Sequence, residues 1–187
     1  MATEVQIAVA GSGKTEEIVK RIKAQSIETR SLALTFTTNG QREIISRAKS
    51  STANNHETTG WFAFLVRHIV RPYLPATFPD IYANGLCLVQ SESEIPRYRS
   101  GWKYYFNDMH QPYSVRLAAL AKKVLKETKQ APIRRLEGIY DTIYIDECQD
   151  LVGNDREVLE VIMKSTIHLF VTGDVRQSVL KHLNPID

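Results

Sequence analysis

Short apolar runs alternate with stretches of helical periodicity in the first and last parts of the chain. Short, mainly apolar runs predict strands over Val5–Val9, Ser31–Phe36, Tyr140–Ile145 and His168–Thr172. Helical spacing predicts a helix through Ile18, Val19 and Ile22, a second over Gln41–Lys49 and a third over Arg156–Met163. This alternation is typical of a parallel sheet with crossover helices. We therefore predict an α/β fold with a central parallel sheet flanked by helices.

The pattern changes between residues 72 and 132. This segment holds six of the seven prolines and an aromatic cluster from Tyr98 to Phe106. One helix is predicted after Pro112, with a core-facing stripe at helical spacing formed by Leu117, Leu120, Ala121, Val124 and Leu125. We therefore expect residues 1–71 and 133–187 to form one domain, and residues 72–132 to form a mainly helical inserted subdomain.

Composition narrows the class of protein. Hydrophobic residues make up 43% of the 187 residues and charged residues 24%, which is typical of a globular chain and excludes disordered and collagen-like classes. A net charge of +3 is too small to indicate nucleic-acid binding by itself. We expect no membrane partner, because no apolar run of about 18 residues and no signal peptide are present. Cys87 and Cys148 lack metal-ligand spacing, and a cytoplasmic location is expected.

A glycine-rich segment, AVAGSGKT, follows the first predicted strand and begins the first predicted helix. Strand, glycine turn and helix are the context in which backbone amides hold phosphate groups. We predict phosphate binding by Ala10, Gly11, Ser12, Gly13, Lys14 and Thr15, with Lys14 on the β- and γ-phosphates and the Thr15 hydroxyl on Mg²⁺. Ala8 stands where the general pattern has glycine, and a simple glycine turn is the competing interpretation.

An acidic cluster, DECQD, follows the strand that ends at Ile145. Ligands of parallel sheets bind at the carboxyl ends of strands, so this cluster should lie beside the glycine-rich segment. Asp146 would then hold Mg²⁺, and Glu147 would orient and deprotonate the water that attacks the γ-phosphate. A solvated turn is the alternative for a charged strand end taken alone.

The strand that ends near Thr172 is also followed by polar residues, VTGDVRQS. Gln177 is placed to contact the γ-phosphate and report its loss. The alternative is a Gly-Asp turn that caps the next helix.

The order GSGKT, LTFTTNGQRE, IDECQD and VTGDVRQS resembles motifs I, Ia, II and III of the UvrD/Rep/PcrA-like superfamily 1 DNA helicases. The segment TTGWFAFLVRHIVRPYL is similar to one in the helicase-like subunit of Gabija defence systems. The resemblance implies a RecA-like P-loop NTPase fold, ATP and Mg²⁺ as cofactors, and a motor domain that couples ATP hydrolysis to DNA translocation or unwinding.

The resemblance also implies roles for residues beyond the phosphate site. Gln149 would link the nucleotide state to DNA contacts, with Asp174 as a supporting partner. Single-stranded DNA would be bound by Thr37, Thr38 and Asn39 of motif Ia and by Trp61, Phe62 and Phe64 of the following segment.

The matched motifs end with motif III, so a second RecA-like domain and its arginines are expected to come from elsewhere. The isolated chain should hydrolyse ATP very slowly, because such an arginine contributes about 10³ to 10⁵ in rate. The expected partners are therefore single-stranded DNA and a second RecA-like domain or a partner subunit such as a nuclease.

Two further interpretations stay open. The chain could be an ATP-gated regulatory or interaction subunit of a prokaryotic defence complex without helicase activity. A nucleotide kinase with the same phosphate loop is disfavoured by the DExQD form of the acidic cluster. A basic and aromatic run that contains Arg97, Arg99 and Lys103 has the ingredients of a single-strand binding patch, although its aromatic rings could instead form the core of the insertion.

Overall fold

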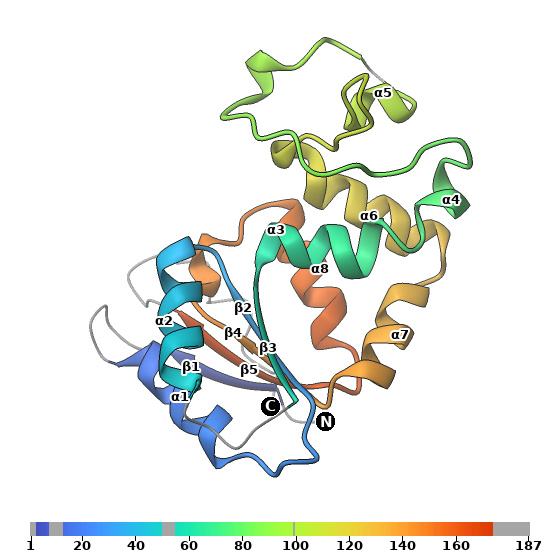
Figure 1. Ribbon diagram of the computed structural model, residues 1–187. Coiled ribbons are helices and arrows are strands. Elements are labelled where there is room, and N and C mark those ends of the chain that lie inside the picture. The colour runs from blue at the N-terminus through green and yellow to red at the C-terminus, as the bar shows by residue number, and fades with distance from the viewer. Residues whose placement is uncertain (1–2, 8–12, 50–54, 99, 174–187) are drawn as a thin grey trace.

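The computed structural model describes residues 3–7, 13–49, 55–98 and 100–173. Within them, five parallel strands form one sheet in the order β1-β5-β4-β2-β3 (Figure 1). The strands are β1 (Thr3–Ile7), β2 (Ser31–Thr35), β3 (His56–Gly60), β4 (Thr142–Ile145) and β5 (His168–Gly173). The predicted α/β class with a parallel sheet flanked by helices is confirmed.

The inner strands are buried on both faces, and their side chains alternate between two cores. In β4, Ile143 and Ile145 face one core, and Tyr144 faces the other. The neighbouring strand β5 repeats the pattern with Phe170 on the Tyr144 side. Continuous apolar runs are what a parallel strand covered on both faces requires, and helices therefore lie on both sides of the sheet.

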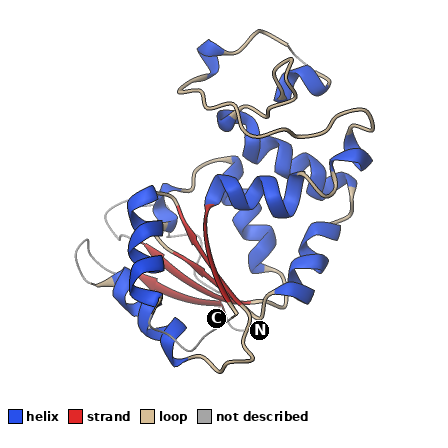
Figure 2. Ribbon diagram, in the orientation of Figure 1, coloured by secondary structure: helices blue, strands red, loops and turns tan. Residues whose placement is uncertain are grey.

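Helices α1 (Lys14–Ala24) and α2 (Thr38–Ala48) cover the Tyr144 face, as Figures 1 and 2 show. Ile18 and Ile22 of α1 and Ile44 of α2 are fully buried there. Ile45, the next residue of α2, is 38% exposed. The burial of this face fixes α1, and with it the position of the residues at its start.

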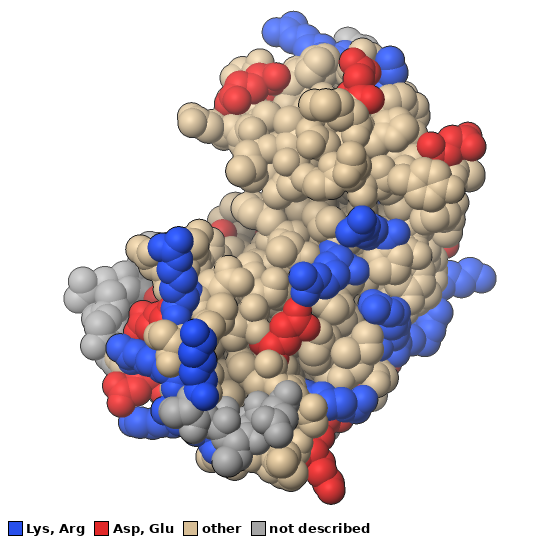
Figure 3. Space-filling model, viewed as in Figure 1, with Lys and Arg blue, Asp and Glu red and all other residues tan. Residues whose placement is uncertain are grey.

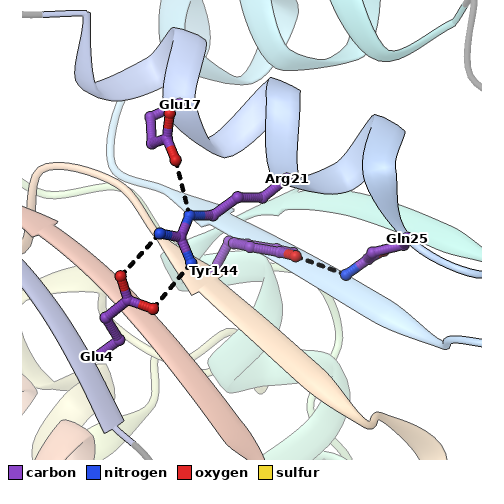
Figure 4. A network of polar contacts seen from close by, with 5 residues as sticks. All are labelled: Glu4, Glu17, Arg21, Gln25 and Tyr144. Carbon is purple, nitrogen blue, oxygen red and sulfur yellow. Dashed lines mark hydrogen bonds and ion pairs between the residues drawn. The ribbon is translucent and has the colours of Figure 1, made fainter.

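A network of polar contacts ties α1 to the sheet (Figure 4). The Arg21 guanidinium donates two hydrogen bonds, of 2.7 and 2.8 Å, to Glu4 of β1 and one of 2.9 Å to Glu17. Its Cζ also lies 3.9 Å from the centroid of the Phe170 ring. These contacts join the amino end of β1 to the side of α1.

The opposite face is covered by α3 (Trp61–Phe64), the π-helical turn η1 (Leu65–Val70), α6 (Leu117–Glu127), α7 (Ala131–Ile139) and α8 (Asn154–Met163). The predicted stripe of α6 is buried as expected, and it packs against η1 and α8. Helix α6 therefore shares the core of the sheet, although it belongs to the segment that we expected to form an insertion.

The remainder of that segment forms a lobe above α6, with short helices and long loops (Figure 1). Its elements are α4 (Leu74–Thr77), η2 (Glu92–Glu94), α5 (Trp102–Tyr105) and η3 (Ser114–Arg116). Phe106 is 1% exposed and joins the main core. Arg116 is also buried, where it donates hydrogen bonds to Glu92 and to the Tyr104 carbonyl oxygen and stacks on the Tyr104 ring. Phe106 therefore packs the lobe onto the body, and the Arg116–Glu92 ion pair joins η3 to η2 within the lobe.

Candidate functional site

The site lies where the strands end, because all described strands of the sheet point the same way. Strands β1, β5, β4 and β2 end at Ile7, Gly173, Ile145 and Thr35. Helix α1 begins at the same edge of the sheet, since Thr15 contacts Asp146 there. Segments that are far apart in the sequence therefore meet at the carboxyl edge of the sheet.

The start of α1 places Lys14 and Thr15. Gly13 precedes the helix with φ 79°, in the left-handed region that glycine adopts without strain. Lys14 is 6% exposed, and its Nζ lies 3.7 Å from Glu147 Oε2. The lysine is thus held at the base of the site, next to the acidic cluster.

Asp146 is the central buried carboxylate, with 3% exposure. The Thr15 hydroxyl donates to its Oδ2 at 2.8 Å, and the Thr172 hydroxyl donates to its Oδ1 at 2.7 Å. A buried carboxylate requires such partners, because an isolated charge is costly to remove from water. The structure therefore brings the two predicted metal ligands, Thr15 and Asp146, into direct contact. Thr172 was not among the predicted site residues.

Glu147 lies next to Asp146 in an unusual backbone conformation. Its φ of 56° and ψ of 46° are left-handed, which costs a non-glycine residue about 1 to 2 kcal/mol. This turn ends β4 and starts η4 (Cys148–Asp150), and the Gln149 side-chain amide donates to Glu147 Oε2. Strained backbone of this kind is concentrated at functional sites, and here it places the Glu147 carboxylate beside Lys14.

The cysteine of the cluster has a structural role. Cys148 is 1% exposed, and burial, reinforced by the nearby Glu147 carboxylate, raises the pKa of its thiol to about 12. A neutral buried thiol is a poor nucleophile. Cys148 and Cys87 are both free thiols.

Two adjoining cavities open around these groups. One, of about 290 Å³, is lined by residues at the start of α1 together with Glu43, Arg47 and Glu147. The other, of about 220 Å³, lies between Thr15, Asp146 and Glu147 on one side and Thr37, Asn39 and Gly40 on the other. Thr15 and Glu147 line both cavities, so the predicted phosphate and metal groups lie beside the segment expected to contact DNA.

The segment expected to contact DNA begins helix α2. Thr37, Thr38 and Asn39 are exposed, and the Thr37 hydroxyl accepts a hydrogen bond of 3.0 Å from the Gly40 amide. This side-chain cap satisfies an otherwise unpaired amide at the helix start. The polar side chains are therefore presented to solvent on a fixed helix terminus.

The aromatic residues predicted to contact DNA occupy different environments. Trp61 and Phe64 are 2% and 0% exposed, and their rings pack against each other with centroids 5.6 Å apart. The Trp61 indole N–H donates to Asp155 Oδ1 at 2.5 Å. Both rings are core groups in this structure, so neither has a face available for a DNA base. Phe62, at 43% exposure, is the accessible one.

The basic and aromatic run lies on the lobe. Arg97 and Tyr98 are exposed, and Lys103 Nζ lies 5.5 Å from the ring centroids of both Tyr98 and Trp102. On the face seen in Figure 3, basic side chains are spread over the surface and do not form a single stripe. A larger cavity of about 670 Å³ lies elsewhere, between α6 and α8, where Lys122 pairs with Glu157.

Several predicted site residues lie outside the described residues. These are Ala10, Gly11 and Ser12 of the glycine-rich segment, Asp174 and Gln177 of the third polar strand end, and Arg99 of the basic run. In the described part of the chain, no three histidine, cysteine, aspartate or glutamate side chains are grouped to hold a metal ion. None of the helices in that part is long and apolar enough to cross a membrane.

A parallel sheet that brings a lysine and a threonine at a helix start together with a carboxylate at the end of another strand defines the P-loop class of α/β proteins, with the RecA-like fold. Residues 3–181 match a family of AAA domains. The match covers almost the whole chain, so the chain belongs to this family, a P-loop NTPase family found in UvrD/Rep-like helicases. Membership implies nucleotide binding with a divalent metal, and nucleotide hydrolysis in general. No curated protein matches the chain.

Proposed function

We propose that the protein is an ATP- and single-stranded-DNA-binding motor domain of a UvrD-like superfamily 1 DNA helicase. It would couple ATP hydrolysis to DNA translocation or unwinding when a second RecA-like domain completes it. The observation that carries the proposal is the contact between Thr15 and Asp146, whose side chains meet at 2.8 Å although 131 positions separate them.

The oxygen donors at this contact fit Mg²⁺. Magnesium prefers oxygen ligands and is usually bound through one or two carboxylates together with water and substrate phosphates. Thr15 and Asp146 supply one hydroxyl and one carboxylate, both of them oxygen ligands. When bound, the metal would neutralise charge on the β- and γ-phosphate oxygens.

Each remaining group has a role that matches its position. Lys14, buried at the start of α1, would neutralise the triphosphate, because its ammonium group faces the same cavity as Gly13. Glu147 would orient a water molecule and accept its proton, and Gln149 holds its carboxylate through one oxygen. Gln177 is proposed to sense the γ-phosphate.

The DNA contact is proposed for Thr37, Thr38, Asn39 and the exposed Phe62. Thr37 and Asn39 line the same cavity as Asp146, so a change in metal binding at Asp146 would occur directly beside this segment. The exposed Tyr98 beside Lys103 offers a further aromatic face of the kind that stacks on unpaired bases. A cytoplasmic location and a completing partner domain or subunit are part of the same proposal.

The experiment is nucleotide binding by the wild-type chain and by Lys14→Ala, measured with a fluorescent ATP analogue and Mg²⁺. Lys20→Ala is the matched control, because Lys20 lies on the same helix but is exposed and pairs with Glu16 at 3.6 Å. We expect binding by the wild type and the control, and loss of at least tenfold in affinity for Lys14→Ala. Equal affinity in all three proteins would contradict the proposed phosphate site.

Repeating the titration with single-stranded DNA tests the motor assignment. If both ligands favour one conformation, each must raise the affinity for the other by the same factor. Coupled binding is expected, with very slow hydrolysis until a second RecA-like domain completes the site. Nucleotide binding without any DNA binding would remove the helicase assignment and favour the ATP-gated regulatory subunit.

A further inference from the structure

We propose that Thr172 is a positioning residue that holds the Asp146 carboxylate in the orientation needed for the divalent metal. The inference rests on the proposed function, because it assigns a role within the same nucleotide site. It concerns a side chain on β5, a strand that carries none of the predicted metal ligands.

The geometry of Asp146 distinguishes its two oxygens. Oδ2 accepts from Thr15 at 2.8 Å, and Oδ1 accepts from Thr172 at 2.7 Å. Thr172 is 0% exposed, so water does not compete for its hydroxyl. The carboxylate is therefore held from both sides by two hydroxyl groups from different elements.

The two hydroxyl groups have different positions relative to the metal. Thr15 is a proposed ligand, and a hydroxyl that binds a cation does so through its oxygen lone pairs. A bound metal ion can therefore take the place of the hydrogen bond between Thr15 and Asp146 Oδ2. Thr172 lies on the other side of the carboxylate and keeps Oδ1 engaged, which restricts rotation of the carboxylate and directs Oδ2 to the metal position.

The backbone around Thr172 makes this arrangement rigid. Thr172 lies one residue before the end of β5 (His168–Gly173), and β5 is paired on one side with β1 and on the other with β4. Its hydroxyl also lies 3.5 Å from the Ile145 carbonyl oxygen, the residue just before Asp146. Partners that orient a metal ligand in this way typically change metal affinity 10- to 100-fold when they are removed.

The test uses Thr172→Val, which has nearly the same shape without the hydroxyl, and Thr172→Ser, which keeps the hydroxyl. Thr142→Val is the matched control, because Thr142 is a buried threonine at the opposite end of the neighbouring strand β4. For each full-length chain, MgCl₂ is titrated against a fixed concentration of fluorescent ATP analogue. Nucleotide affinity is measured separately in EDTA, and folding is monitored by circular dichroism.

We expect Thr172→Val to need about 10- to 100-fold more Mg²⁺ for the half-maximal change in fluorescence of the ATP analogue. Thr172→Ser and Thr142→Val should be close to the wild type. Nucleotide affinity in EDTA should be the same in all four proteins, because the proposed contact of Lys14 with the phosphates does not require the metal. A structural role would instead lower affinity with and without metal, and that result would overturn the inference.

An unchanged Mg²⁺ requirement in Thr172→Val would also overturn the inference, while leaving the proposed function intact. Failure of the wild-type chain to bind nucleotide in a Mg²⁺-dependent way would overturn both. If Thr172→Val does not fold, Thr172→Ala replaces it in the comparison with Thr172→Ser, and the same criteria apply.

Discussion

The hydrogen bond between Trp61 and Asp155 joins the beginning of α3 to the first turn of α8, the helix that follows the acidic cluster. The indole N–H donates to the Asp155 carboxylate at 2.5 Å, and Trp61 is 2% exposed. Trp61→Phe keeps an aromatic ring in the core and removes the donor. The substitution therefore tests whether this contact holds the two helices together.

The expected loss of stability has two parts. A hydrogen bond to a charged group contributes about 1.5 to 3 kcal/mol, and the smaller ring leaves a cavity that costs roughly 1 kcal/mol. The free energy of unfolding at pH 7 should therefore fall by about 2.5 to 4 kcal/mol. For a chain of this size that corresponds to a decrease in Tm of about 5 to 15 °C.

The loss should also depend on pH. Burial raises the pKa of Asp155, and the Trp61 hydrogen bond opposes that rise, so its removal raises the pKa further. Because the folded-state pKa lies above the unfolded one, the carboxylate destabilises the fold above its folded pKa, and this effect disappears as the pH falls toward the unfolded value. The difference between wild type and Trp61→Phe should thus be largest at neutral pH and smaller near pH 4.

Urea unfolding followed by circular dichroism at pH 7 and pH 4.5 measures both effects. Trp102→Phe is the control, since Trp102 is only partly buried and packs against the His110 ring. The double variant with Asp155→Asn gives the coupling energy between the two side chains. A loss below about 0.5 kcal/mol at pH 7, or an equal loss at both pH values, would refute the reasoning.

Three further predictions follow from other contacts. Burial lowers the pKa of His56 to about 4, below its unfolded value of 6.5, so the contribution of neutral His56 to the free energy of unfolding is fully present above pH 6.5 and is lost as the pH falls from 6.5 to 4. His56→Gln should reduce this acid sensitivity by up to roughly 3 kcal/mol in urea unfolding. Identical pH profiles for the wild type and the variant would contradict the prediction. Thr37→Ala should lower the free energy of unfolding by about 1 kcal/mol through loss of the α2 cap, with Thr37→Ser close to the wild type. Arg116→Lys should destabilise the lobe, because lysine cannot replace the paired hydrogen bonds to Glu92 and the stacking on Tyr104. Hydrogen exchange at residues 87–114 should therefore increase, while β4 stays protected. Unchanged exchange in the lobe would show that apolar packing alone holds its elements together.

The sequence was sufficient to predict the strands that are buried on both faces. The runs through Leu32 and Ile143 are mainly apolar, because helices cover both faces of the sheet there. Strand β3 (His56–Gly60) was not predicted. Its sequence is HETTG, and only Thr59 in it is buried, since an edge strand has one neighbour and tolerates polar side chains. A pattern based on hydrophobicity has no signal for such a strand.

The same limit applied to the aromatic residues after β3. Trp61, Phe62 and Phe64 are all aromatic and lie within four positions, but Trp61 and Phe64 are buried and Phe62 is exposed. Their environment depends on which side of α3 faces α8, and that is a property of packing. The boundaries of the expected insertion stay a prediction, and helix α6 of that segment packs in the core of the sheet.

The sequence by itself determined the class of fold and predicted that Lys14, Thr15, Asp146 and Glu147 lie at one edge of the sheet, where the structure has them. Glycine turns and carboxylates at the ends of parallel strands are local features, and parallel strands bring their ends to one edge regardless of the detail of packing. Only the tertiary structure decided the partners of each group. The hydrogen bond from Thr172 to Asp146 and the burial of Trp61 arise between elements distant in the chain, where three-dimensional packing sets the distances and local sequence patterns do not.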